Sequence, residues 1–472
     1  RKKRKKMKKI VSALLVAGLL VILLVVGGTG RHRVINVQNE PEQITGEKED
    51  KGSAGEADGK TNENGAETKE NTEDISNHLK IGVLLIGDET ENYSRAHIEG
   101  ITQAAEAIGI MGDEIEWKER IDNSDDSYDA VEELLDDGCN LLIANASVQQ
   151  DALLDAAENH PEAKFVVIGG DKAAVSGLDN YYNAYTDIYE ARYLSGVVAG
   201  MKIAQLDRKG KISKYGYDES GKVRVGYIGT YPNAEVISGY SAFYLGMKSV
   251  MKNVVLEVYY TNSWLDMDAE ATAADKLIRS GCVLIAQHGN SDSAASTIEK
   301  AWKRGRHVYY VGCNTDMSET APNATLTSVV SNWDVYYTQL FTAVEEEKEF
   351  PHDWSQGLSE GAVSLTKLSA YVAPKTAAKI KKVREKIESD KLHVFDISKF
   401  TVGGIWISDQ DAMIDLSLTD ETEDTEASED DIIKSALTSY DKGAYFAEST
   451  LRSAPYFDLH IDGIEEVNKT EE

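Results

Sequence analysis

The chain of 472 residues contains only three cysteines, and their spacing matches neither a disulfide framework nor a metal-binding motif. Negative charge also predominates over positive charge, with a formal net charge of −30 at pH 7. Nucleic acid is therefore excluded as an expected partner, since phosphate binding needs clustered lysine and arginine. Apolar residues make up 42% of the chain, which suffices for globular lobes but not for a polytopic membrane protein.

Sequence signals for catalysis are weak. The chain contains no Walker loop and no zinc motif. The glycines near the first predicted strand lack the Gly-x-Gly-x-x-Gly order of a dinucleotide site. His288 stands alone at the end of a predicted strand, where a pocket or capping role is favoured over catalysis. We therefore expect no enzyme, no metal site and no cofactor.

The chain opens with a basic stretch and an apolar run. Eight lysines and arginines lie among the first nine residues, and residues 10–26 are apolar. A helix over that run spans about 26 Å, close to the bilayer core of about 30 Å. We expect residues 1–30 to be a signal peptide or membrane anchor, with the anchor favoured because no Ala-x-Ala site closes the run. No cysteine follows the run, so no lipid attachment is expected.

The next segment, residues 31–78, is rich in Glu, Lys, Gly, Asn and Thr and has few large apolar residues. Such a composition cannot bury enough surface to order itself. We predict a disordered acidic linker that holds the folded part away from a membrane. At the other end, residues 401–472 are expected to form a C-terminal extension with an acidic loop.

One stretch of the chain occurs twice. Gly-Cys-Asn-Leu-Leu-Ile-Ala-Asn begins at Gly138, and Gly-Cys-Val-Leu-Ile-Ala-Gln begins at Gly281; each is followed by a helix pattern and a second apolar run. Cys139 and Cys282 stand 143 positions apart (282 − 139). A constant offset over a strand, a helix and a strand indicates a duplicated βαβ unit. The two cysteines are then expected to be buried structural thiols in separate lobes.

The repeat predicts an α/β fold of two doubly wound, Rossmann-like lobes with a central cleft, preceded by one N-terminal apolar helix. The ligand-binding domain is expected over residues 79–400. Lobe 1 would cover about 79–200 with segments returning after about 330, and lobe 2 about 222–325. A ligand is expected between the lobes, because open α/β sheets bind at the carboxyl ends of their strands.

Two tyrosines hold similar places in the two halves. Tyr93 and Tyr240 each follow the first strand and loop of their half and fall within the next predicted helix. Facing each other across a cleft, they could sandwich a flat ring, since aromatic faces stack favourably. The alternative is that each tyrosine packs only against its own lobe.

Polar residues follow the predicted core strands. They are Asn145 with Ser147, Asp171, His288 with Gly289 and Asn290, and Asn314 with Asp316. Carboxylates and amides at these places could take the hydroxyls of a sugar. The alternative for the aspartates is that they cap the following helices, where aspartate is favoured.

With these segments placed, the chain resembles the basic membrane protein family over about residues 79–400. The resemblance rests on the order and spacing of several short motifs rather than on any one of them. They are Asn92-Tyr93-Ser94 with Glu99-Gly100, the helix from Tyr189 to Gly200, Val311-Gly-Cys-Asn-Thr-Asp316, Leu326-Thr-Ser-Val-Val, and Gly357-Leu-Ser-Glu-Gly-Ala-Val. The family implies a type I periplasmic-binding-protein fold and a role in nucleoside import.

The resemblance also implies site residues. Tyr93 and Tyr240 match two base-stacking phenylalanines, and Asp171 matches an aspartate that holds ribose. Gly289 falls near a glycine that lines the pocket. Asn314 and Asp316 match a sugar-binding Asp-x-Asp stretch. With Asn92, Asn145 and Ser331, these residues form the predicted ligand site.

The chain departs from the family at two pocket positions. Asn314 stands where the family has aspartate, and Ser331 stands where it usually has a lysine, with Asn332 beside it. Loss of this pair could leave the charge of the pocket balanced yet change the ligand. Purine nucleoside is therefore the leading ligand class rather than a settled one.

Taken together, the sequence predicts an extracytoplasmic solute-binding protein that delivers a small polar ligand to the permease and ATPase of an ABC importer. We expect it at the outer face of the cell membrane, held through its N-terminal segment. The first alternative is a sensor with the same binding domain on an uncleaved anchor. An enzyme on the same fold is a weaker alternative, because no nucleophile or metal motif supports it.

Overall fold

The computed structural model describes residues 79–417 and 433–469. The predicted N-terminal helix and linker lie outside these residues, as does the acidic run of the C-terminal extension. Within the two described ranges, no helix is long and apolar enough to cross a membrane.

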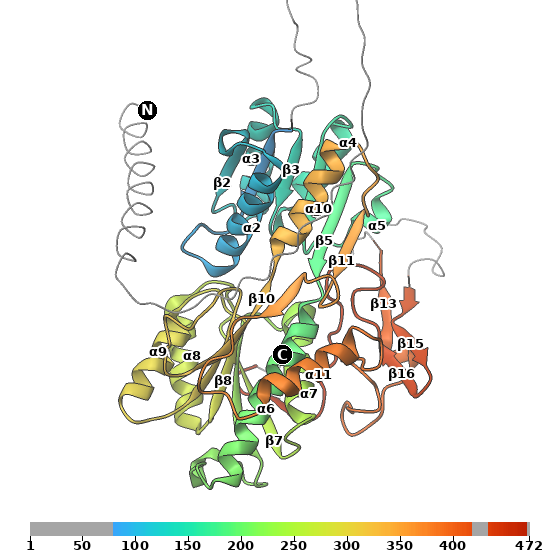
Figure 1. The fold of residues 1–472 in the computed structure, drawn as a ribbon. Helices are drawn as coiled ribbons and strands as arrows, with labels where there is room; N and C mark the ends of the chain where they lie inside the picture. Colours follow the sequence, from blue (N-terminus) through green and yellow to red (C-terminus); the bar gives the residue numbers. More distant parts are fainter. Residues whose placement is uncertain (1–78, 418–432, 470–472) are drawn as a thin grey trace, which may run out of the picture. The chain divides into compact units, whose positions relative to one another are not determined.

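The first lobe is built on a six-stranded sheet with the order β11-β5-β4-β3-β1-β2, and every neighbouring pair is parallel (Figure 1). Its central strands are mainly apolar because helices cover both faces of the sheet, whereas the strands at its two edges also carry charged and polar residues. The strands are β1 (Ile81–Leu85), β2 (Ile115–Glu119), β3 (Leu141–Ala144), β4 (Lys164–Ile168), β5 (Tyr181–Thr186) and β11 (Asp353–Gln356). The helices are α2 (Asn92–Ile108), α3 (Ser124–Asp136), α4 (Gln150–Asn159), α5 (Ala173–Ser176) and α10 (Trp333–Glu345).

The second lobe has a seven-stranded sheet with the order β12-β10-β9-β8-β6-β7-β17. Only β12 runs antiparallel to its neighbour. The strands are β6 (Val223–Gly229), β7 (Val254–Tyr260), β8 (Leu284–Gln287), β9 (Tyr309–Cys313), β10 (Thr325–Ser331), β12 (Val363–Leu365) and β17 (Ile464–Glu466). The helices are α6 (Ile188–Arg208), α7 (Ala234–Lys248), α8 (Met267–Ser280), α9 (Ser293–Lys303) and α11 (Thr376–Ile387).

The predicted duplication recurs in local detail. Gly138 and Gly281 both end a helix with positive φ, and each is followed by a buried cysteine. The amide of Cys139 donates to Leu134, and that of Cys282 donates to Leu277, 143 positions further on (277 − 134). All three cysteines are buried free thiols, as expected for Cys139 and Cys282.

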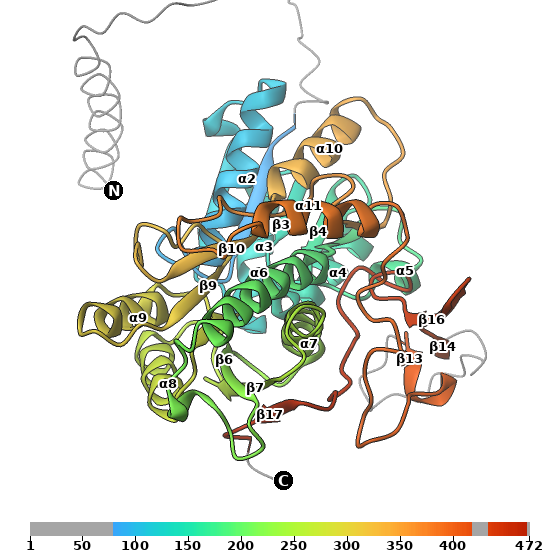
Figure 2. The same ribbon diagram turned by 60° about the horizontal axis from the view of Figure 1, so that its bottom comes forward.

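The chain crosses between the lobes through exchanged helices. α6 follows β5 of lobe 1 but belongs to the hydrophobic core of lobe 2, whereas α10 follows β10 of lobe 2 and packs on α2 of lobe 1. α6 and α7 lie side by side in Figure 2. The boundary of lobe 1, expected near residue 200, therefore falls at Asp187, just before α6. α6 crosses over because its small residues fit the closely packed α7 rather than the first sheet.

The C-terminal residues beyond about 400 reach both lobes. They form the hairpin pairs β13 (Met413–Asp415) with β14 (Ile433–Ser435) and β15 (Leu437–Tyr440) with β16 (Gly443–Phe446). The chain then returns so that β17 adds an edge strand beside β7 (Figure 2). The extension is thus built into the second sheet.

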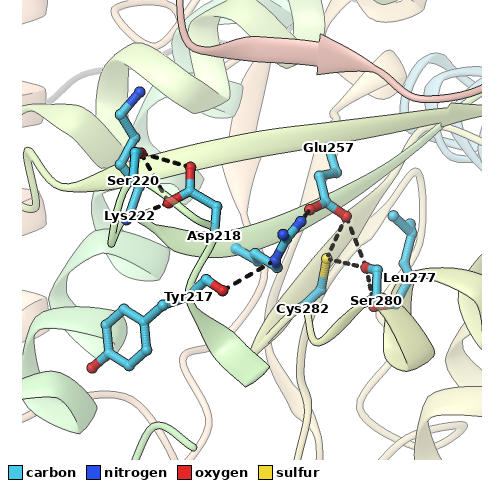
Figure 3. Close-up of polar contacts among 9 residues, drawn as sticks. Tyr217, Asp218, Ser220, Lys222, Glu257, Leu277, Ser280 and Cys282 are labelled. Atoms are coloured by element: carbon cyan, nitrogen blue, oxygen red, sulfur yellow. Dashed lines mark hydrogen bonds and ion pairs between the residues drawn. The ribbon is translucent and has the colours of Figure 1, made fainter. Parts of the chain in front are cut away.

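A buried charged group braces the second sheet near the starts of its strands. Glu257 of β7 forms an ion pair with Arg224 of β6 and accepts a hydrogen bond from Ser280 at 2.8 Å (Figure 3). The thiol of Cys282 lies 3.6 Å from the same carboxylate, and burial raises its pKa well above the ordinary value. These residues lie at the end of the sheet opposite to the carboxyl ends of the strands, so we assign them a structural role.

Candidate functional site

A cleft opens where the carboxyl ends of both sheets meet. Its empty space amounts to about 810 Å³ when the part open to solvent is counted. Both lobes line it directly after their strands. From lobe 1 these residues are Ile86, Asn145, Gly169 and Tyr185, and from lobe 2 they are Trp264, His288, Asn314 and Ser331.

Four aromatic side chains form much of the cleft wall: Tyr93, Tyr185, Trp264 and Trp333. The hydroxyl of Tyr93 donates to the carbonyl oxygen of Asn145 at 2.9 Å, which fixes the ring. The ring of Trp333 stacks on buried His97 with centroids 4.3 Å apart. Burial, together with the nearby Glu235 and Glu91, holds the pKa of Tyr93 well above its ordinary value, so its hydroxyl is neutral. The walls therefore offer rigid, uncharged faces.

Lobe 2 contributes the charged groups of the cleft. Glu235, in the first turn of α7, lies 3.4 Å from Nε2 of His288. Nδ1 of His288 faces the hydroxyl of Tyr227 at 3.2 Å. Burial and the charge of Arg192 lower the pKa of His288, which keeps the imidazole neutral near pH 7. Arg192, from α6, completes this group.

Amide side chains line the remaining edge of the cleft. Asn145 is fully buried, and its Oδ1 accepts from the amide of Ile86 at 2.8 Å. Asn314 has a positive φ of 64° and donates to Oδ1 of Asn290 at 2.9 Å. Asparagine tolerates this left-handed backbone better than most residues. These amides could meet the hydroxyls of a ligand.

The two lobes touch beside the cleft. The amide of Asn92, at the start of α2, donates to the carbonyl oxygen of Asn290 at 3.0 Å. The side chain of Asn92 donates to Asp292 at 3.1 Å, and Arg95 donates to Thr315 at 3.2 Å. The N-terminal turn of α2 is thus docked on the loops after β8 and β9, and the structure has its lobes closed.

Four of the predicted site residues line this cleft: Tyr93, Asn145, Asn314 and Ser331. Asn92 belongs to the contact between the lobes, and Asp316 lines a second hollow beside it. That these residues touch a ligand stays a prediction. The other three residues of the predicted site lie elsewhere.

Tyr240 does not reach the cleft. It is fully buried in α7, where its ring packs on Tyr227 and its hydroxyl donates to Glu466 at 3.3 Å. Tyr93 and Tyr240 therefore do not face each other across the cleft. α7 begins at Ala234 and α2 at Asn92, so the counterpart of Tyr93, the second residue of α2, is Glu235. The spacing of the two tyrosines suggested that they are equivalent, but Tyr93 lies at the start of α2 whereas Tyr240 lies well inside α7.

Asp171 and Gly289, which were predicted to contact the ligand, also lie outside the cleft wall. Asp171 lies 3.5 Å from Arg452 of the C-terminal extension and is absent from the cleft wall. Gly289 packs against the buried carboxylate of Glu270, which leaves no room for a side chain there. Its neighbours His288 and Asn290 line the cleft instead. Position after a strand end alone does not determine which of the neighbouring residues faces the cleft.

Sequence reasoning missed several lining residues, among them five that are aromatic or charged: Tyr185, Arg192, Glu235, Trp264 and Trp333. Tyr185 and Trp264 could have been found, because they follow the same strand-end rule as the predicted residues. Arg192 had a different signal, as a charged residue shortly before the small and apolar run from Leu194 to Gly200 of its helix. Glu235 had no sequence signal beyond its place in the first turn of a helix.

The expectation that the chain has no nucleophile motif is wrong at the level of sequence. Residues 357–361 read Gly-Leu-Ser-Glu-Gly, which has the spacing of a hydrolase nucleophile elbow. Such an elbow needs a turn between a strand and a helix, but Ser359 is exposed in a turn between two strands, β11 and β12. The structure therefore gives no support to a serine nucleophile. In the described ranges, no cluster of three or more His, Cys, Asp or Glu side chains could hold a metal.

Two parallel-stranded lobes with a closed polar and aromatic cleft define a two-lobed solute-binding protein. The chain belongs to the family of PnrA-like ABC transporter substrate-binding proteins, whose model matches residues 85–398. The predicted resemblance to basic membrane proteins is thereby confirmed, and members of this family are extracytoplasmic solute-binding proteins. The match ends where the C-terminal extension begins.

Individual relatives agree with this assignment. A purine-binding protein of Brucella abortus (strain 2308) is 30% identical over 312 residues, covering 64% of this chain and 81% of that protein. Basic membrane protein A2 of Borrelia garinii subsp. bavariensis is 24% identical over 255 residues, covering 54% and 68%. A solute-binding protein of an ABC transporter from Aeropyrum pernix K1 has a TM-score of 0.56 at 15% identity, over 71% of this chain and 95% of that chain. The last shows the fold alone.

Proposed function

We propose that this protein captures a purine nucleoside outside the cytoplasm and presents it to the permease and ATPase of an ABC importer. The observation that carries the proposal is the closed interlobe cleft, whose four aromatic side chains offer flat faces for a base. The purine-binding relative supports the choice of ligand. Membrane attachment through the N-terminal segment belongs to the same proposal.

The polar groups of the cleft suit the rest of a nucleoside. Asn145, Asn314 and Ser331 present amide and hydroxyl groups, which can both donate to and accept from ribose hydroxyls. The hydroxyl of Ser331 already bonds Thr186 of the other lobe at 2.7 Å. A sugar bound there would add contacts to both lobes, and a ligand that contacts both lobes favours the closed form.

Thermal unfolding of the purified protein with a panel of nucleosides, sugars and amino acids tests the proposal. A ligand at 100 times its Kd should add about 2.7 kcal/mol of stability. Tyr93→Ala should abolish the shift, whereas Tyr215→Ala, a change at an exposed tyrosine, should not. A shift with sugars alone would overturn the nucleoside proposal.

Recovery of the bound nucleoside separates binding from turnover. After overnight incubation with the protein, mass spectrometry should find the nucleoside unchanged. Conversion to base and ribose would instead favour an enzyme on this fold.

A further inference from the structure

Arg192 is a buried cation without a matching anion. The side chain lines the cleft from α6 and is 2% exposed. Its two terminal nitrogens donate to the carbonyl oxygen of Gln287 and to the sulfur of Cys313, both at 2.8 Å. Its Nε has no hydrogen-bond partner among the described residues. None of the ion pairs within residues 79–417 and 433–469 includes Arg192.

A buried charge that lacks a partner costs free energy, and a protein retains such a charge where another molecule pairs with it. In a binding protein the ligand can do so. The free N–H of Arg192 calls for an acceptor atom, such as a carbonyl oxygen or a ring nitrogen.

Glu235 lies on the same side of the cleft and supplies hydrogen-bond acceptors, where Arg192 supplies donors. Its side chain is 29% exposed and lies beside the neutral ring of His288. It also lies close to the hydroxyl of Tyr185 in lobe 1. A carboxylate offers about four acceptor sites, so these neighbours leave capacity for two donors from a ligand.

The two groups flank the end of β8. Glu235 contacts the side chain of His288, and Arg192 donates to the carbonyl oxygen of Gln287, the preceding residue. An anionic ligand would meet the repulsion of Glu235, and a cationic one the repulsion of Arg192. The pair instead suits a neutral ligand that carries acceptors and donors side by side.

We propose that Arg192 and Glu235 read the edge of the base, and that the site selects 6-oxopurine nucleosides, guanosine above all. This inference rests on the proposed function. In guanine, O6 and N7 accept hydrogen bonds from a guanidinium, as in arginine recognition of guanine in DNA. The adjacent N1–H and 2-amino group can both donate to one carboxylate. Adenine reverses the pattern at positions 6 and 1, and therefore presents a donor to Arg192 and an acceptor to Glu235.

Titration calorimetry of the full-length protein with guanosine, inosine and adenosine tests the inference. Inosine lacks only the 2-amino group, and adenosine also replaces the 6-oxo group. We expect guanosine to bind at least about tenfold more tightly than adenosine, with inosine between them. Glu235→Gln should weaken guanosine about tenfold and narrow its advantage over adenosine, because the amide offers one acceptor and turns a donor to the base. Glu219→Gln, at an exposed turn, is the matched control and should change nothing.

Two outcomes overturn the inference alone: equal binding of adenosine and guanosine by the unmodified protein, or an equal loss of both in Glu235→Gln. Absence of binding by every nucleoside would overturn the proposed function and this inference with it. The glutamine variant is expected to fold, because Glu235 is partly exposed and near the surface of the cleft.

Discussion

At the scale of single residues, the side of a helix that a residue occupies decides whether it reaches the cleft. Successive helix residues differ by about 100° around the axis. Gly239 faces His288, a residue of the cleft wall, and an added Cβ would lie 3.1 Å from its ring. The next residue, Tyr240, therefore turns into the core of lobe 2. Sequence spacing placed Tyr240 on the correct helix but could not fix its rotation.

Tyr240→Phe tests this placement. The change removes a hydroxyl that bonds Glu466 and Tyr260, both at 3.3 Å. We expect the free energy of unfolding to fall by about 0.5–1.5 kcal/mol, the net worth of such bonds. Nucleoside affinity should stay unchanged. Urea unfolding and calorimetry measure the two quantities. Because phenylalanine keeps the ring, the decisive quantity is stability, and an unchanged free energy of unfolding would contradict the placement of the hydroxyl in the core of lobe 2.

Glu448 should make stability depend on pH. This glutamate of the C-terminal extension is 3% exposed, and burial raises its pKa to about 8 from 4.5, against the opposing effect of its hydrogen bonds. Its protonated form stabilises the folded state fully below pH 4.5. As pH rises from 4.5 towards 8, the unfolded chain loses this proton first, so the contribution is progressively lost.

Comparison with Glu448→Gln isolates this contribution. The variant keeps a neutral side chain at every pH, so its stability should fall less between pH 5 and 8. We expect a difference on the order of 3 kcal/mol between the two proteins across that range. Urea unfolding at several pH values measures it, with exposed Glu219→Gln as control. Parallel pH profiles of the Glu448 variant and the unmodified protein would contradict the prediction.

At the scale of elements, the sequence predicted the strands that are marked by a run of apolar residues. Strands β1, β3, β4 and β8 are short buried runs, and the repeated offset indicated that a strand–helix–strand unit recurs in the two lobes. β11 and β17 were missed because each is a short edge strand with few buried residues. Their pairing depends on the tertiary structure, since each is joined to a strand far away in the chain.

The small residues of α6 allow it to pack closely against α7, and this contact lies within lobe 2. The sequence did not predict which helix α6 packs against. A Cβ on Gly246 of α7 would overlap the carbonyl oxygen of Tyr193 on α6, and one on Gly196 would overlap that of Phe243. Backbone therefore lies against backbone here, and glycine is required for the approach rather than for its flexibility.

Gly246→Ala measures this contact. In an open helix the change would stabilise by about 1 kcal/mol through helix propensity. Here the overlap with Tyr193 should prevail and destabilise the protein by about 1–3 kcal/mol. Gly112→Ala is the control, because a Cβ there meets nothing within 4 Å. Thermal unfolding should separate the two variants, and a stabilised Gly246 variant would show that the helices can move apart freely.

At the scale of the whole molecule, the C-terminal extension ties the two lobes together. β17 fixes it to the sheet of lobe 2, where Glu466 also bonds Tyr240. On lobe 1, Arg452 lies 3.5 Å from Asp171, and the amide of Ser453 donates to Asp353 of β11 at 3.0 Å. Because the family match ends at residue 398, this tie is an addition to the two-lobed fold. It should limit how far the lobes open by a hinge motion.

Arg452→Ala tests the tie, because it removes one of the two contacts with lobe 1, the ion pair with Asp171, and leaves β17 in place. The ion pair is only partly buried, so its loss should cost about 0.2–1 kcal/mol. If the pair is retained in the closed form and strained in the open form, its loss favours opening. Ligand dissociation should then quicken up to about fivefold, and the ligand-free protein should be larger by small-angle scattering. Arg306→Ala, at an exposed arginine, should change neither quantity. If Arg452→Ala lowers stability but leaves dissociation and size unchanged, the extension only braces the fold and does not govern its opening.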